Sequence, residues 1–519
     1  MAHQFSQVPQ ARIPRSSFNR SHGLKTTFDA GKLIPIFLDE VLPGDTHSLR
    51  ATMFGRLATP LKPIMDNLFL ETFFFFVPTR LIWDNWQKFN GEQTNPGDST
   101  DFVVPQFAGI NVAEGDILDY MGVPPKNGII CNALPPRAYD LIFNEWFRDQ
   151  NLQNSVPLET GDSGDVNPGA PYNRGKRHDY FTSALPFRQK GDAVTVPLAG
   201  DAPVGNDGTA TIFTNGTDIR TLSGQTGAIQ ARWSSNPSTD GAMSLEAPGS
   251  SGVIADLSAV SGIEINTLRE SFQIQKLLER DARGGTRYTE IVRSHFGVVS
   301  PDARLQRPEF LGGGTSMINI NPVQQTSATS LDSGGTVADT PQGNLAAYGT
   351  VTAQGHGFTK SFTEHGYIIG IVNVRADLTY QQGLHRLWSR QTRYDFYWPA
   401  LAHLGEQAVL NQEIYYDAAD GENENVFGYQ ERYAEYRYKN SEITGKFRSD
   451  ATASLDVWHL AQDFTTRPTL SAGFIQDQPP IDRVSAVPDE PDMLLDCYFR
   501  YRSVRPMPVY GTPGLIDHF

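Results

Sequence analysis

Few residues of this sequence are spaced in a way that would support catalysis. There is no HExxH, GxSxG or GxxxxGK[ST] motif, so no zinc protease, serine hydrolase or phosphate-binding loop is indicated. Gly312 to Gly314 could form an anion-binding nest, but we favour a tight bend at a strand edge. His356 and His365 lack a carboxylate at ligand spacing, and Asp489 and Glu490 lie in a Pro-rich stretch typical of a solvated loop. We expect no catalytic residue, metal site or cofactor.

Residues that could bind a polyanion lie at the two ends of the chain. The formal net charge of the 519 residues is -15, which argues against a surface that is basic throughout. Residues 1–28 and 498–505 nevertheless carry basic side chains and no carboxylate. Phe5 and Phe18 lie among the N-terminal arginines and could stack on unpaired bases. The candidate nucleic-acid contacts are Arg12, Arg15, Arg20, Lys25, Tyr498, Arg500, Arg502 and Arg505.

Each end of the chain also allows another interpretation. The N-terminal segment could be a solvated tail without a ligand, since basic tails are common. Residues 493–504 form a predicted strand that turns Tyr498, Arg500 and Arg502 away from the core, and that face could equally be a surface between subunits.

Three further segments have strand patterns. Residues 47–57 alternate between apolar and polar side chains, which predicts a half-buried strand. Residues 67–77 are apolar on both faces and predict a strand that is covered on each side. Residues 367–378 predict a strand near one side of a closing sandwich. The connection between the first two is too short for a crossover helix, so they should be antiparallel or lie in two sheets.

Helices are predicted to be short. Residues 135–146 carry an apolar stripe that ends at Trp146. Thr267 and Glu270 resemble a capping box before a helix that stops at Gly284. A further helix presents His295 on an apolar face, which favours a satisfied core histidine over a ligand.

Composition sets further limits. Hydrophobic residues make up 39% of the chain, and 47 Gly and 34 Pro imply many turns, so we expect a loop-rich, mainly β protein. The densest apolar stretch is interrupted by Glu71 and Thr72, which argues against membrane insertion. The N-terminus lacks the apolar region of a signal peptide, so synthesis and assembly in a cytoplasm are expected. Cys131 and Cys497 are too few for a disulfide framework.

One long segment differs in composition from the rest. Residues 192–262 are rich in Gly, Ala, Ser and Thr, contain no lysine, and carry seven carboxylates against two arginines. A disordered linker is one interpretation; we favour an exposed but ordered excursion because β-forming residues recur in it. Residues 327–349 are predicted to form a second surface loop.

Long stretches of the chain resemble one protein family. Residues 287–320 (RYTEIVRSHFGVVSPDARLQRPEFLGGGTSMINI) and 355–415 (GHGFTKSFTEHGYIIGIVNV and onward) are similar to the major capsid protein of the gokushoviruses, a branch of the Microviridae. Residues 27–78 and the closing strand before VYGTPGLIDHF resemble the same family. The similarity covers nearly the whole chain and is weakest at 192–262 and 327–349.

The resemblance implies an eight-stranded antiparallel jelly roll with long loop insertions and a few short helices. It also implies a T=1 icosahedral shell built through pentamers around a circular single-stranded DNA genome, hence location in the virion. Residues 1–32 would be a basic arm facing the interior, and 33–519 a single capsid domain. The implied partners are further copies of the chain, a small basic DNA-binding protein, an internal scaffolding protein and a bacterial host surface receptor.

Host contact would fall on the long insertion at 192–262, which the resemblance places at the three-fold axes as a protrusion. The candidate contact residues there are Asp207, Asp218, Arg220, Arg232, Trp233 and Asp240. The alternative function is a β-sandwich surface-binding module, for example one that binds glycans, and the missing export signal counts against it. A hydrolase comes third because no motif supports it.

Overall fold

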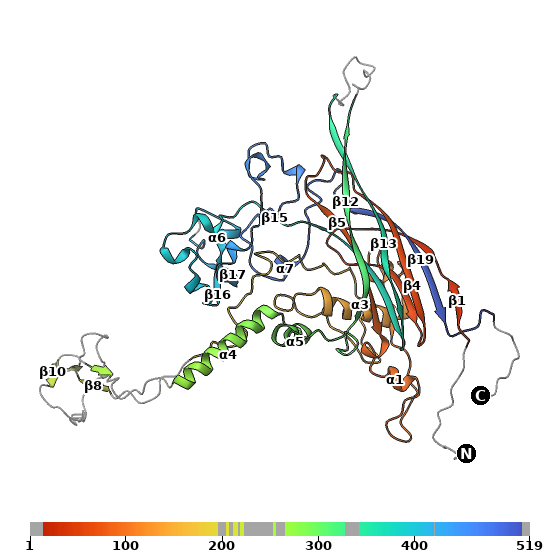
Figure 1. The fold of residues 1–519 in the computed structure, drawn as a ribbon, viewed down its shortest axis with the longest axis horizontal. Helices are drawn as coiled ribbons and strands as arrows, with labels where there is room; N and C mark the ends of the chain where they lie inside the picture. Colours follow the sequence, from red (N-terminus) through yellow and green to blue (C-terminus); the bar gives the residue numbers. More distant parts are fainter. Residues whose placement is uncertain are drawn as a thin grey trace. The chain divides into compact units, whose positions relative to one another are not determined.

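The computed structural model describes residues 14–195, 204–206, 211–215, 218–222, 253–255, 265–326, 342–419 and 421–510 (Figure 1). Backbone contacts divide the chain into two compact units. The first consists of residues 1–188 and 282–519, and the second of residues 189–281. Among the described residues, no helix has the length and apolar character required to cross a membrane.

The first unit is built on one continuous antiparallel path of strands. The hydrogen-bonded order is β1-β19-β4-β13-β12-β5-β14-β3, and β2 also pairs with β19. Because β1 and β2 follow one another along the same edge of β19, the path has eight strand positions. The strands are β1 (Ser16–Asn19), β2 (His22–Phe28), β3 (Ile34–Val41), β4 (Thr46–Leu57), β5 (Leu68–Pro78), β12 (Glu309–Gln324), β13 (Leu345–Ser361), β14 (Gly366–Ala376) and β19 (Met493–Arg505).

The path forms two halves, and the chain passes repeatedly between them. One half contains β1/β2, β19, β4 and β13, and the other contains β12, β5, β14 and β3. The predicted eight-stranded antiparallel jelly roll is therefore confirmed. The prediction that residues 47–57 and 67–77 are antiparallel or lie in two sheets is also confirmed, since β4 and β5 belong to different halves.

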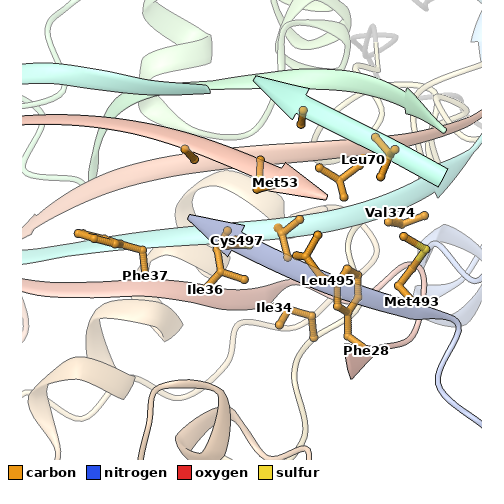
Figure 2. Packing of buried hydrophobic residues seen from close by; sticks show 14 of the residues in the cluster. Phe28, Ile34, Ile36, Phe37, Met53, Leu70, Val374, Met493, Leu495 and Cys497 are labelled. Carbon is orange, nitrogen blue, oxygen red and sulfur yellow. The ribbon is translucent and has the colours of Figure 1, made fainter. Parts of the chain in front are cut away.

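The main hydrophobic core lies between the two halves (Figure 2). Met53 and Cys497 come from one half, and Ile34 and Leu70 from the other. Aromatic rings also meet across the core, with the centroids of Phe37 and Phe499 5.3 Å apart. The strict alternation of buried and exposed residues along β4 and β19 follows, because one face of this half packs on the core and the other does not.

The strands β5 and β14 are buried on both faces because helices cover their outer side, which confirms the prediction for residues 67–77. α3 (Leu134–Ile142), which continues into a π-turn at Phe143–Phe147, packs Tyr139 and Ile142 against Phe75 and Ile369. The other short helices of this unit are α1 (Trp86–Phe89), α2 (Ile117–Tyr120), α5 (Tyr288–Phe296), α6 (Asn411–Ile414) and α7 (Ala472–Ile475).

Long insertions separate the strands of the jelly roll. The segment between β5 and β12 holds α3 and the whole second unit. The segment between β14 and β19 helps to form a smaller core around Phe181, Val409 and Phe427. Its short strands are β15 (Thr379–Tyr380), β16 (Glu406–Leu410), β17 (Val426–Glu431) and β18 (Ser441–Glu442), and β6 (Gln106–Ile110) and β7 (Ile129–Asn132) form a separate hairpin.

The second unit contains two small strand pairs and most of α4 (Ile265–Gly284). β8 (Val204–Asn206) pairs with β11 (Val253–Ala255), and β9 (Thr211–Asn215) pairs with β10 (Asp218–Leu222). Because α4 begins at Ile265, Thr267 and Glu270 lie inside the helix, and the capping box predicted to start it is wrong. Thr267 therefore lies in the first turn of α4 and not at the position before the helix.

Two other expectations differ from the structure. His295 is only half-buried, because α5 has no buried residue and exposes 71% of Tyr288 and 77% of Phe296. The interpretation as a core histidine is therefore wrong, whereas Gly297 ends α5 in the left-handed conformation as predicted. Gly312 to Gly314 form neither a nest nor a bend but lie within β12, where a Cβ at Gly313 would clash with the carbonyl group of Thr72.

Two segments with predicted boundaries overlap strands of the jelly roll. From Ser16 onward, most of the segment predicted as an arm at residues 1–32 lies in strands, because β1 and β2 pair with the edge of β19. Of the predicted 327–349 loop, residues 345–349 belong to β13 and residues 327–341 lie outside the described residues.

Candidate nucleic-acid and assembly surfaces

The outer face of the β1/β2-β19-β4-β13 half gathers basic and aromatic side chains. Alternate residues of these strands turn away from the core, and those on the outer side are exposed. We call this surface the basic face and define it by Lys25, Arg50, Phe54, Arg56, Tyr498, Arg500 and Arg502. It contains four of the predicted nucleic-acid contacts, and β4 adds Arg50 and Arg56, which were not predicted.

Strand register fixes how these side chains lie relative to one another. Arg500 on β19 lies directly opposite Arg50 on β4, and Tyr498 lies opposite Thr52. Lys25 on β2 lies opposite Asp496 and pairs with it at 3.1 Å between Nζ and Oδ1. Like charges directly opposite one another in a sheet are destabilising. A bound anion would therefore reduce the repulsion between Arg50 and Arg500.

The four arginines of the basic face lack counter-charges. Among the residues that the structure describes, Arg50, Arg56, Arg500 and Arg502 make no ion pair and no side-chain hydrogen bond. Phe54 and Tyr498 are about half exposed beside them. Guanidinium groups next to exposed rings are the side chains that bind single-stranded nucleic acid, by phosphate contact and base stacking.

Two of the predicted contacts, Arg20 and Arg505, belong instead to an internal cluster. Arg20 pairs with Asp39 in a bidentate contact, and Arg505 Nε lies 3.1 Å from Asp45 Oδ2. Their positive charge is therefore neutralised within the subunit, and we leave both out of the basic face. Arg15 is exposed, and Arg12 lies outside the described residues.

Tyr501 is the centre of this internal cluster. Its hydroxyl donates to Asp39 Oδ2 at 2.5 Å and lies 2.8 Å from Nδ1 of His47, whose Nε2 is 3.0 Å from Asp45. Burial lowers the pKa of His47 and raises the pKa of Tyr501. The cluster joins β3, β4 and β19 at one end of the jelly roll, so its role is structural.

A second surface, which the sequence did not predict, lies in the insertion between β14 and β19. We call it the aromatic surface and define it by Trp388, Tyr394, Phe396, Tyr397, Trp398 and Tyr436. All six rings are exposed, with 75% of Trp388 and 66% of Tyr394 accessible. The only sequence signal for it was the string YDFYW at residues 394–398, which lacks strand or helix periodicity.

The aromatic surface is held in place although it is exposed. The guanidinium group of Arg390 lies 4.2 Å from the centre of the Tyr436 ring, and that of Arg393 lies 4.5 Å from Trp398. Trp398 Nε1 also donates to the carbonyl of Arg393 at 3.0 Å. Exposed Trp, Tyr and Arg side chains in a fixed geometry are typical of protein–protein interfaces.

The structure describes no side-chain positions for the predicted host-contact residues. Asp218 and Arg220 belong to β10. Asp207, Arg232, Trp233 and Asp240 lie outside the described residues.

The histidines and carboxylates considered for chemistry have other environments. His356 is buried and hydrogen-bonded to Thr72 and Ser316, and His365 packs edge-on against Trp86. Within the described part of the chain, no three His, Cys, Asp or Glu side chains form a group that could hold a metal ion.

Comparisons with known proteins agree with the fold. Residues 6–515 match the family model described as capsid protein (F protein). Capsid protein VP1 of Bdellovibrio phage phiMH2K is 48% identical, over 100% of this chain and 98% of that protein. Capsid protein VP1 of Chlamydia phage 1 is 46% identical (99% and 98%), and that of Spiroplasma virus 4 is 38% identical (99% and 97%). The family predicted from the sequence is thus confirmed, and the chain belongs to the F-protein family of phage capsid proteins, a structural rather than an enzymatic family.

Proposed function

We propose that this capsid protein assembles through pentamers into a T=1 icosahedral shell that packages circular single-stranded DNA. The basic face carries the proposal, because it gathers four unpartnered guanidinium groups, as far as the described residues extend, on a chain with net charge -15. Phosphates of the genome would supply the missing counter-charge, and Phe54 and Tyr498 would stack on unpaired bases. The basic face therefore lines the interior of the shell.

Self-association is supported by the aromatic surface. Its exposed Trp and Tyr side chains are the residue types that dominate binding energy in interfaces. In a closed symmetric assembly each copy repeats the same contact, so moderate contacts add up to a stable shell. We assign the aromatic surface to contacts between neighbouring subunits.

The second unit, residues 189–281, is the part proposed to form the three-fold protrusion and to contact a receptor on the bacterial host. Its separation from the jelly roll in backbone contacts supports this role, since removing it need not disturb the core. The proposed partners inside the particle are a small basic DNA-binding protein and an internal scaffolding protein, with assembly in the host cytoplasm.

Purified protein tests the shell directly. Mixing it with scaffolding protein and circular single-stranded DNA and imaging the product by negative-stain electron microscopy should show closed particles that protect DNA from nuclease. Only monomers or dimers under every condition would overturn the proposal. Glycan binding by such monomers would instead favour a β-sandwich surface-binding module.

A deletion variant distinguishes the part of the chain that forms the shell from the part that forms the protrusion. Removing residues 205–251 should leave particle formation intact and reduce attachment of particles to host cells. Failure to assemble would show that the second unit is required for the shell itself, and unchanged attachment would exclude the proposed receptor contact.

A further inference from the structure

A pocket of about 740 Å³ lies in the first unit, on the outer side of β5. Its lining comes from β5, β12, the π-helix after α3 and residues 148–152 that follow it, residues 174–185, and the segment that joins α4 to α5. The main core separates β5 from the opposite half of the jelly roll, so the pocket and the basic face lie on opposite sides of the two-sheet sandwich. The pocket is therefore independent of the proposed DNA surface.

One wall of the pocket is aromatic. Phe73, Trp146, Phe147 and Phe310 line it, and Phe310 is 42% exposed. The centroids of Phe73 and Phe147 are 5.2 Å apart, and those of Trp146 and Phe310 are 6.0 Å apart. Adjacent, partly exposed rings of this kind offer surfaces on which another ring-shaped group can pack.

The rest of the lining carries an excess of positive charge. Arg174 and Arg283 have carboxylate partners outside the pocket lining, Glu71 for the first and Glu406 and Glu431 for the second. Within the described residues, Arg177 and His178 are exposed and have no ion pair or side-chain hydrogen bond.

Two further arginines of the lining are only partly satisfied. The Nε atoms of Arg148 and Arg287 are buried without a hydrogen-bond partner in the described structure. Burial, followed by the charge of the nearby Arg287, lowers the pKa of the Arg148 guanidinium. Two guanidinium groups that repel one another gain from an anion placed between them.

The carboxylates of the lining do not neutralise this charge. Asp149 accepts hydrogen bonds from the backbone amides of Asn151 and Leu152, and Glu290 pairs with Arg287. Arg148, Arg177 and His178 remain without a carboxylate partner among the described residues. The pocket thus combines an aromatic wall with an unneutralised cationic wall.

We infer that this pocket binds a phosphate ester carried on a ring-shaped body, with the phosphate on the Arg148, Arg177 and Arg287 side and the ring against Phe310. Arginine suits phosphate because its planar group donates several hydrogen bonds at once. The aromatic wall would make the pocket bind a ring-bearing phosphate ester more tightly than inorganic phosphate. A nucleotide and a sugar phosphate share this chemistry, and the experiment distinguishes them.

Calorimetric titration of the purified full chain with inorganic phosphate, adenosine monophosphate and glucose 1-phosphate tests the inference. We expect saturable binding of at least one ring-bearing phosphate, tighter than that of inorganic phosphate. The ring-bearing probe that binds more tightly identifies the source as nucleotide or glycan. Absence of saturable binding for all three probes would overturn the inference.

Variants assign the binding to this pocket. Arg177→Gln should weaken the ring-bearing phosphate roughly tenfold or more, since it removes a charge-assisted contact from an exposed position. Phe310→Ala should weaken the ring-bearing phosphate and leave inorganic phosphate unchanged. Arg304→Gln, which removes an exposed arginine outside the lining, is the matched control. Unchanged affinity in both pocket variants, with thermal unfolding as a check of folding, would overturn the inference.

Discussion

The salt dependence of DNA binding gives a quantitative prediction for the basic face. For single strands, the logarithm of the binding constant falls with the logarithm of salt concentration by about 0.7 per phosphate contact. If Arg50, Arg56, Arg500 and Arg502 each contact one phosphate, the slope should be about -3. The double variant Arg50→Gln/Arg500→Gln should reduce it to about -1.4.

Fluorescence anisotropy of unassembled subunits with a labelled oligonucleotide, repeated over a series of salt concentrations, measures this slope. Arg293→Gln/Arg304→Gln is the matched control, because it removes two exposed arginines that lie outside the basic face. The control should keep the slope of the unaltered chain. An unchanged slope in the Arg50/Arg500 variant, or an equal change in the control, would refute the assignment of these arginines to phosphate binding.

Stability provides a second readout for the same variant. Arg50 and Arg500 lie directly opposite one another, so removing both charges should leave the thermal midpoint of the free subunit unchanged or slightly raised. Weaker DNA binding together with an unchanged or raised thermal midpoint would show that the two arginines bind DNA and do not stabilise the fold. A lowered midpoint would show that they support the fold.

Three further predictions concern the Tyr501 cluster, the buried carboxyl of Asp140, which accepts a hydrogen bond from Tyr172, and the aromatic surface. Tyr501→Phe removes the hydroxyl that donates to Asp39 and should cost about 2 kcal/mol, seen as a lower thermal midpoint; an unchanged midpoint would contradict the proposed role of the cluster. Burial raises the pKa of Asp140 to about 7 in the folded state, compared with about 3.9 in the unfolded chain. Between about pH 4 and 7 the folded state keeps the proton that the unfolded chain loses, so the stability contributed by this carboxyl falls as the pH rises. Asp140→Asn should therefore flatten the pH dependence of the thermal midpoint between about pH 4 and 7, and an unaltered profile would exclude this carboxyl as its source. Tyr394→Ala/Trp398→Ala should abolish particle formation, measured by sedimentation, without lowering subunit stability, and normal particles would exclude the aromatic surface from subunit contacts.

The strands were predictable because their patterns are local. The alternation in β4 and β19 reflects one covered face, and the apolar runs in β5 and β14 reflect two. The outward position of Tyr498, Arg500 and Arg502 followed from the same periodicity. The jelly-roll fold was predicted from the family resemblance alone, and the order of the strands was not predicted, because pairing between β19 and β4 joins residues more than 400 positions apart.

The roles of individual charges could not be read from the sequence. Arg20 and Arg505 resemble the other basic residues at the chain ends, but Asp39 of β3 and Asp45, just before β4, lie beside them in the fold. Arg50 was not among the predicted nucleic-acid contacts, because only the strand register places it opposite Arg500. The aromatic surface was missed because an irregular segment has no period that would separate exposed rings from core rings.

The radial position of Arg50 and Arg500 in an assembled particle tests the central claim most directly. An electron cryo-microscopy reconstruction of particles that contain DNA should place both side chains on the inner wall, against density for nucleic acid, with Trp398 at a contact between subunits. A particle in which both arginines face the outer surface would contradict the account.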